Sequence, residues 1–504
     1  MRRVMIRFRI ILAGVMVWVA GAWSSHGFSL LGQFQAWQTS DIGYQQPGDI
    51  GGPVRPNQGY RWNLPEITYG FDQTFITYFG PDGMRAVDQA MKVFNDLPPM
   101  SKISTDGFSF FVNGEIVPTT TTQVNQDARA LGLIDLKSFA MHMVIEELGL
   151  AEPERWAWAL RGRRVITATD PDSTNYTVIN LNFDPITLQP SPVVNGITYG
   201  YDIVEANNPF VSDAEEIPVD VLSTFPFTSV AGARSLLTAS VGGASIGTLQ
   251  FDSGRFYTGL THDDVGGLRW LYSSKNFAVE NLETNVTYGT PARGGGSPWA
   301  PFFGGSNIVV GTNILFNTNL LVREALRPGI NDLRFRRVNF DSQLGRLMVP
   351  ITNRYMDQFL TNGRVMIQPV QRVITLPDII FVVDDLGLDT GLVPFLTSRS
   401  PTSQWINNDA INGRDTTVDG GPGVIAPPVT ITFTDQLPVY FLDTDIFFIL
   451  GIPFGFGPPL DSTLQSRFFL WGSFDESSST PIIYPQYGNI TIQDLRQSAV
   501  GGGN

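Results

Sequence analysis

The sequence predicts an α+β region followed by an all-β region with antiparallel, sandwich-like sheets. Two observations favour the first part: apolar residues recur with the period of a helix over residues 84–97 and again over residues 135–149. A third favours the second part. After about residue 275 the chain shows strand-like alternation, most clearly at Val429–Thr434, where apolar and hydroxyl residues alternate as in a half-buried antiparallel strand. No helical pattern is found between residues 310 and 500.

Changes in composition along the chain predict its organisation. A chain of 504 residues is long enough for about two to four domains with their own cores. We expect, in order, a signal peptide (1–22), an extended N-terminal arm (23–60), an α+β domain (61–275), a glycine-rich linker (276–306) and a β-sandwich region of one or two domains (307–504). The α+β domain and the β-sandwich region are expected to have separate cores.

The first 22 residues have the pattern of a secretory signal peptide. Four arginines precede an apolar run, Ile10–Ala22, which is shorter than the ~20 residues of a spanning helix and ends in a small-residue cleavage site, Ala20-Gly21-Ala22. Cleavage is expected after Ala22 or a few residues later, and it removes four positive charges, so the formal net charge changes from −14 to −18. The sequence therefore predicts an exported protein with no membrane span in its mature part. Its acidity argues against nucleic acid as a partner.

The chain has no cysteine, so disulfides and thiolate metal sites are excluded. It has three histidines, of which His26 lies close to the expected cleavage site. The histidines expected to be robust in the mature chain are therefore His142 and His262.

Each element of the first part has its own signal. A strand is expected at Glu66–Phe71, and Pro98-Pro99 should end the helix that follows Asp82-Gly83. The second helix should end at Gly149 and should pack against the first. Further helices are expected after Pro153, near Ser229–Ser240, and from a capping box at Thr261–Asp264 to Tyr272.

The second part consists of runs with strand character. They are Ile308–Phe316, Leu333–Phe340, Arg364–Leu376, Ile379–Val383, Val429–Thr434, Val439–Leu442, Arg467–Trp471 and Ile482–Tyr484.

The second helix carries the pattern of side chains with the clearest chemistry. His142 and Glu146 are four residues apart, so they lie one turn apart on one helix face. Gly149 can take the left-handed conformation that ends the helix, after which Glu152 can return to the same point. This is the spacing of the metzincin zinc motif, H-E-x-x-H-x-x-G-x-x-H, with its glycine in place.

Residues 60–273 resemble the metzincins, and the matrixin branch most closely, because a strand, a helix, the motif helix and a closing helix at residues 262–272 occur in the same order. The whole chain is also similar to a group of exported bacterial proteins without an assigned activity. The resemblance implies a zinc peptidase fold, but the catalytic glutamate of the family is replaced by Met143, and two histidine ligands by Glu146 and Glu152. A thioether cannot take a proton from metal-bound water, so no catalytic residue is assigned.

Three interpretations of His142, Glu146 and Glu152 remain open. The scaffold survives without a metal; or the three residues bind a divalent metal, zinc or a harder ion, with help from His262; or the spacing is accidental. The first predicts a non-catalytic extracellular or cell-surface protein that acts in binding or structure, with an extracellular protein or a glycan as its partner. The alternative is a metal-dependent, peptidase-like hydrolase with an altered His-Glu-Glu site.

Two weaker patterns remain. Gly243–Gly247 matches the G-x-S-x-G pattern of serine hydrolases, but a flexible glycine-rich loop is the expected structure because no doubly wound pattern surrounds it. Acidic and amide residues could hold Ca²⁺, although without EF-hand spacing solvated turns are expected instead: Asp384, Asp385, Asp389, Asn407, Asn408, Asp409 and Asp415.

Overall fold

The structure is a computed structural model of the chain. It describes residues 26–42, 50–107, 109–166, 173–205, 212–218, 228–232, 254–289, 321–340, 348–384, 404–407, 422–434, 437–439, 467–475 and 480–485. The predicted signal peptide, the Gly243–Gly247 pattern and the predicted strand Ile308–Phe316 lie outside these residues.

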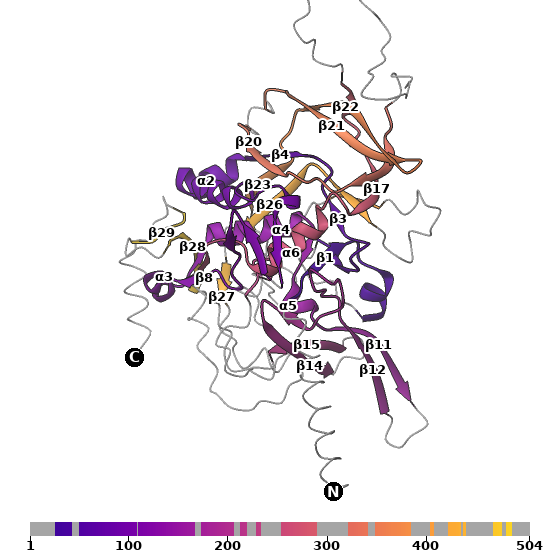
Figure 1. The fold of residues 1–504 in the computed structure, drawn as a ribbon. Helices are drawn as coiled ribbons and strands as arrows, with labels where there is room; N and C mark the ends of the chain where they lie inside the picture. The colour runs from indigo at the N-terminus through magenta and orange to yellow at the C-terminus, as the bar shows by residue number, and fades with distance from the viewer. Residues whose placement is uncertain are drawn as a thin grey trace, which may run out of the picture.

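A four-stranded parallel sheet lies at the centre of the fold. Its order is β20-β4-β23-β26, and each neighbouring pair is parallel. The predicted strand β4 (Glu66–Phe71) is confirmed, and it lies between β20 (Arg334–Arg337) and β23 (Ile379–Asp384), with β26 (Val429–Thr434) beyond (Figure 1). Strands from both ends of the chain therefore complete one sheet.

This sheet shows that the expected separation into two cores is wrong. One hydrophobic core contains buried residues from Phe28 in the N-terminal segment to Tyr484 near the C-terminus. Its aromatic centre joins Phe75 and Phe79 to Phe433, with ring centroids 5.8 and 5.6 Å apart. The composition changes near residue 275, but a change from helices to strands does not prevent later strands from pairing with an earlier one.

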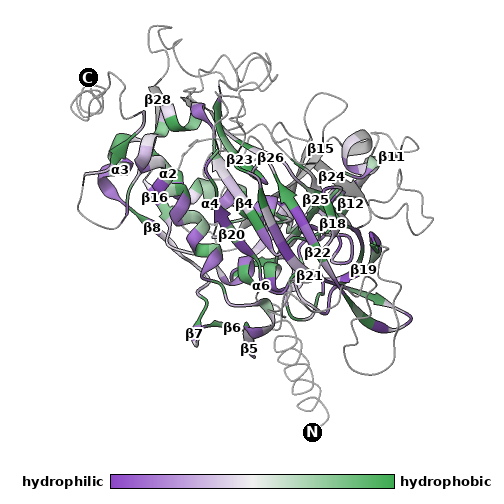
Figure 2. Ribbon diagram, turned by 90° about the horizontal axis from the view of Figure 1, so that it is seen from above, coloured by the Kyte–Doolittle hydropathy of each residue, from purple (hydrophilic) through white to green (hydrophobic). Residues whose placement is uncertain are grey.

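The direction of β26 also differs from the prediction. The alternation in Val429–Thr434 is real, since Val429, Ile431 and Phe433 are all buried in the core, where Figure 2 shows hydrophobic residues along this strand. The strand pairs parallel to β23, however, and not antiparallel. Alternation fixes which face of a strand is buried, and it carries no information about the direction of the neighbouring strand.

A second, antiparallel sheet has the order β17-β19-β21-β22-β18. Its main part is a long hairpin of β21 (Ile351–Thr361) and β22 (Arg364–Ile374), joined at Asn362 and Gly363, which both have positive φ as a type I′ turn requires. The other strands are β17 (Phe277–Asn281), β18 (Val286–Tyr288) and β19 (Glu324–Pro328).

Two expected irregular segments are in fact folded. Residues 276–289 of the expected linker include β17 and β18, because the glycine-rich composition begins only after them. The expected N-terminal arm forms β1 (Ser29–Gly32), a π-helix at Trp37–Ile42, β2 (Gly52–Val54) and β3 (Tyr60–Arg61). Apolar side chains hold it in the core, where Leu30 and Tyr60 have no exposed surface.

The helices predicted at residues 84–97, 135–149, after Pro153 and at 261–272 are present with shifted ends, whereas the helix predicted near Ser229–Ser240 lies largely outside the described residues. Helix α2 (Gln73–Asn95) begins earlier than expected because Asp72 caps an additional segment, which is broken at Gly80 (φ 62°) before Pro81 starts the predicted part. Helix α4 (Leu136–Glu147) matches the second predicted helix and packs against α2, which confirms that pairing. The remaining α-helices are α3 (Gln126–Leu131), α5 (Pro153–Trp156) and α6 (His262–Leu271), and a 3-10 helix lies at Met100–Lys102.

The remaining strands complete the described part. They are β5 (Ser104–Asp106), β6 (Ser109–Val112), β7 (Glu115–Ile116), β8 (Thr122–Val124), β9 (Leu133–Asp135), β10 (Leu150–Ala151), β11 (Ala159–Ile166), β12 (Ser173–Ile179), β13 (Val193–Val194), β14 (Ile197–Glu205), β15 (Ser212–Pro218), β16 (Arg255–Tyr257), β24 (Gln404–Asn407), β25 (Gly423–Ala426), β27 (Leu437–Val439), β28 (Arg467–Ser473) and β29 (Ile482–Ile483). Every regular element described after residue 272 is a strand. Within the described residues, we find no helix with the length and apolar character needed to cross a membrane.

Candidate functional site

Local interactions set both ends of the motif helix α4. At its start, the carboxylate of Asp135 accepts hydrogen bonds from the Ser138 backbone N (2.9 Å) and from the Ser138 hydroxyl (2.6 Å). At its end, Gly149 has φ 98°, and a Cβ at this position would lie 2.1 Å from the carbonyl oxygen of Tyr60. Two separate reasons therefore require glycine at position 149: its left-handed backbone conformation, and the lack of space for a side chain beside β3.

His142 and Glu146 face one another on this helix. His142 Nε2 lies 3.7 Å from Glu146 Oε2, and both residues are buried. His142 Nδ1 lies 3.1 Å from the carbonyl oxygen of Val230. A carbonyl can only accept a hydrogen bond, so Nδ1 carries the proton and donates it, which leaves the lone pair of Nε2 on the side of Glu146.

Glu152 does not join the other two predicted ligands. After Gly149 the chain enters β10, where Leu150 and Ala151 pair with β1, and this extended step carries Glu152 to the start of α5. There its Oε2 accepts a hydrogen bond from Arg155 Nη1 (3.3 Å). Within the described residues, His142, Glu146 and Glu152 are not a group whose ligand atoms all lie within 4.8 Å of one another.

Residues Thr228–Gly232 lie over the motif helix and are held there by two buried carboxylates. Glu154 accepts hydrogen bonds from the backbone N of Thr228 (3.0 Å) and of Ser229 (2.8 Å), and from the Ser229 hydroxyl (2.6 Å). Burial raises the pKa of Glu154 to about 7, although these hydrogen bonds act in the opposite direction.

Asp264 is the second of these carboxylates. It accepts from the backbone N of Val230 (2.9 Å) and of Ala231 (3.0 Å). Asp264 Oδ2 also accepts from Thr261 N and Oγ1, which confirms the predicted capping box of α6. The two carboxylates thereby fix the Val230 carbonyl against His142.

Met143, the residue that follows His142, is part of the hydrophobic core. Met143 is 1% exposed and belongs to the same core as Phe139, Val87 and Met91, as expected for the faces of α2 and α4 that meet. No basic side chain therefore occupies the position at which the metzincin motif has its glutamate.

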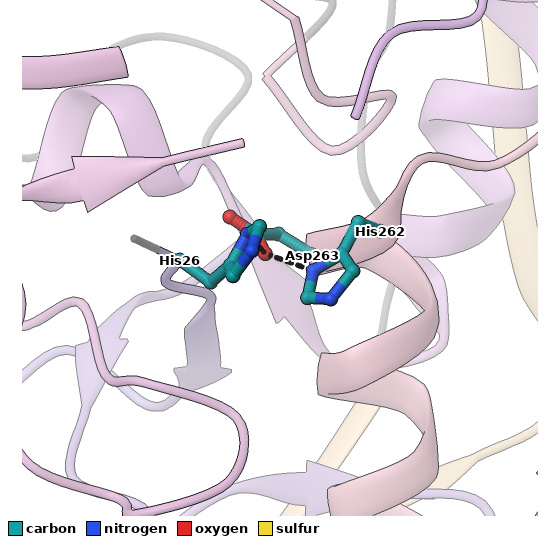
Figure 3. Close-up of side chains that lie close together, drawn as sticks. All are labelled: His26, His262 and Asp263. Carbon is teal, nitrogen blue, oxygen red and sulfur yellow. Dashed lines mark hydrogen bonds and ion pairs between the residues drawn. The ribbon is translucent and has the colours of Figure 1, made fainter. Parts of the chain in front are cut away.

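A different cluster brings three possible metal ligands together. His26, His262 and Asp263 have ligand atoms that all lie within 4.8 Å of one another, and within the described part of the chain this is the one such group of three or more (Figure 3). His262 Nδ1 lies 2.7 Å from Asp263 Oδ1, and His26 Nδ1 lies 3.2 Å from the same oxygen. The two imidazole rings stack with centroids 3.6 Å apart and planes inclined by 26°.

Asp263 is held in place by backbone groups from two distant segments. Its Oδ2 accepts hydrogen bonds from Gly27 N (2.8 Å) and from Asn195 N (2.6 Å). Burial acts to raise the pKa of Asp263, but interactions with His26 and His262 outweigh it and lower that pKa below its usual value. The carboxylate is therefore kept ionised with Oδ1 directed at the two rings.

The sequence analysis missed this cluster because His26 lies close to the expected cleavage site and was therefore left out of the robust histidines. Cleavage directly after Ala22 would leave His26 in the mature chain, and His262-Asp263 places an imidazole and a carboxylate at the start of one helix. These two features of the sequence could have indicated possible metal ligands, but only the fold brings residues 26 and 262 together.

The acidic and amide residues that were considered as possible Ca²⁺ ligands lie largely outside the described residues. Of these residues, Asp384 is exposed at the end of β23, and Asn407 ends β24.

Comparison with known proteins does not help to assign the motif helix or the cluster of His26, His262 and Asp263. No family model, no curated protein and no solved structure matches this chain.

Proposed function

We propose that this chain is an exported protein that acts in binding or structure through a non-catalytic scaffold resembling that of a metzincin peptidase. The observation that carries the proposal is that His142 is buried and hydrogen-bonded to the backbone. Its side chain has no exposed surface, and its Nδ1 donates to the Val230 carbonyl, which Asp264 holds in position. A peptide would have to displace this backbone segment before it could reach the motif helix.

The chemistry of the neighbouring residues supports the same conclusion. In the zinc peptidase mechanism a glutamate next to the first histidine takes a proton from metal-bound water, and loss of such a base typically costs about 10²–10⁴ in rate. Here that residue is Met143, which lies in the core. The carboxylate of Glu146 would also reduce the effective charge of any metal held beside His142.

The proposed partner is an extracellular protein or a glycan. The predicted charge of −18 after export favours solubility and disfavours nucleic acid or an anionic surface. Retention of the motif helix is then explained by its role in the core, because α4 packs on α2 and on β28.

Peptide cleavage tests the non-catalytic proposal directly. The mature chain is incubated with a broad peptide library in the presence of Zn²⁺, Mn²⁺ or Ca²⁺, with and without chelator, beside a His142→Gln variant as the matched control. We expect no chelator-sensitive cleavage in either protein. Cleavage by the wild type that disappears in His142→Gln would overturn the proposal.

The second candidate function is a metal-dependent hydrolase, and one observation favours it. Metal-binding histidines usually donate their other ring N–H to a carbonyl or a carboxylate, as His142 does to Val230, and its Nε2 lies 3.7 Å from Glu146 Oε2. The same cleavage assay decides between the two functions, because only the hydrolase requires His142 for turnover.

A further inference from the structure

His26, His262 and Asp263 form a cluster of possible metal ligands that is separate from the motif helix. Two imidazoles and one carboxylate suit zinc and the neighbouring transition metals. All three residues are buried, with 8%, 2% and 1% of their surface exposed. Buried imidazole and carboxylate groups at this spacing need either mutual hydrogen bonds or a cation.

Hydrogen bonds account for only part of the cluster. Asp263 Oδ1 accepts from His262 Nδ1, but His26 Nδ1 has no hydrogen-bond partner within the described residues, although it lies 3.2 Å from the same oxygen. An unsatisfied buried ring nitrogen is costly. A cation bound by both rings and the carboxylate would satisfy it.

The surroundings orient the ligands as metal sites do. Gly27 N and Asn195 N occupy Asp263 Oδ2, which leaves Oδ1 to face the histidines. Phe110 covers the other side of His262, with ring centroids 4.6 Å apart. Donors around a four-coordinate zinc ion lie roughly 3–3.5 Å apart, close to the observed 2.7 and 3.2 Å.

We propose that His26, His262 and Asp263 bind one divalent transition-metal ion of the zinc class, which fastens the N-terminal segment to the start of α6. Binding displaces the proton of His262 Nδ1, as metal ligation by histidine requires. His26 turns toward the ion without breaking a hydrogen bond of its Nδ1 within the described structure. The site is structural, and it does not depend on the proposed function.

The test is metal titration of the mature full-length chain after removal of bound metal with a chelator. Zn²⁺ binding is measured by calorimetry, and Co²⁺ binding by its visible absorption. We expect one equivalent to bind to the wild type and to His142→Gln, the control for the motif helix. In His26→Phe, which keeps an aromatic ring beside His262 but has no donor, affinity should fall by more than about 100-fold, since losing only a supporting residue already costs 10–100-fold.

Two results would overturn the proposal. A folded wild-type chain that binds neither ion would mean that the histidines share Asp263 without a metal. Binding that is lost in His142→Gln and kept in His26→Phe would place the ion on α4. Far-ultraviolet circular dichroism of each variant identifies a failure to fold, and His26→Gln then serves as a second variant for the same measurement.

Discussion

Thr68 donates two hydrogen bonds to one carboxylate oxygen of Asp378, although the two residues are 310 positions apart in the sequence. The Thr68 backbone N and its hydroxyl both lie 2.8 Å from Asp378 Oδ2. The other oxygen, Oδ1, binds Arg372 Nη2 at 2.5 Å. Asp378 thus joins β4 to β23 and to the antiparallel sheet, and it connects the two parts that the sequence had suggested were independent.

Removal of this carboxylate should destabilise the whole fold. Asp378→Ala leaves the buried guanidinium of Arg372 and two donors of Thr68 without their partner, so we expect the free energy of unfolding to fall by about 3–5 kcal/mol. Urea denaturation of the mature chain measures the change. The control is Asp384→Ala, at the exposed end of the same strand, where a change within about 0.5 kcal/mol is expected. Equal effects at both positions would contradict this role for Asp378.

The first part of the chain should not fold without the second. A fragment that ends at Lys275 lacks β20 and β23, the two strands that pair with β4. Both edges of β4 and the apolar face beneath it would then be exposed, so we expect no cooperative urea transition from the fragment, whereas the full mature chain shows one. A fragment with slowly exchanging amide protons in residues 66–71 would show that these residues fold alone.

Two glycines with positive φ offer a matched comparison. Gly149 (φ 98°) has the Tyr60 carbonyl oxygen 2.1 Å from the position of an added Cβ, whereas Gly363 (φ 71°) has nothing within 4 Å. The left-handed conformation of alanine at either site lowers the free energy of unfolding by about 1–2 kcal/mol, and overpacking at position 149 lowers it by about 1–3 kcal/mol more. Thermal or urea unfolding should therefore rank Gly149→Ala well below Gly363→Ala in stability. Similar losses would mean that β3 can move away from the end of α4.

Glu283 should make stability depend on pH. Burial raises the pKa of Glu283 from 4.5 to about 7, with Arg372 opposing the shift. The folded state therefore binds more protons than the unfolded state between these values, and the stability contributed by this group is lost as the pH rises through about 7.

The Glu283→Gln variant removes this dependence. Its free energy of unfolding relative to the wild type should be higher at pH 8 than at pH 4.5 by roughly 1–3 kcal/mol. Urea denaturation at the two pH values checks this, with the exposed Glu324→Gln as the control. An unchanged difference between Glu283→Gln and the wild type would show that Glu283 titrates normally in the fold.

Local signals in the sequence were enough to locate many elements. The Asp135 cap, the Gly149 stop and the Thr261 capping box each depend on contacts within a few residues, so helices α4 and α6 were predicted close to their observed ends. The additional segment at the start of α2 was missed because Gly80-Pro81 indicates a break, although here it is a kink between two helical segments. Alternation likewise located β4 and β26, but it did not give the direction of pairing.

The sequence by itself determined the spacing of His142, Glu146 and Glu152, the presence of Met143 where the metzincin motif has a glutamate, and the absence of thiol ligands. Only the tertiary structure decided which side chains meet. The pairing of β10 with β1 carries Glu152 away from His142, and the contact of the N-terminal segment with α6 brings His26 to Asp263. Short-range patterns specify caps, periods and turns because those interactions are local. Contacts between residues hundreds of positions apart depend on how the strands pair and how the core closes, and no single segment encodes that.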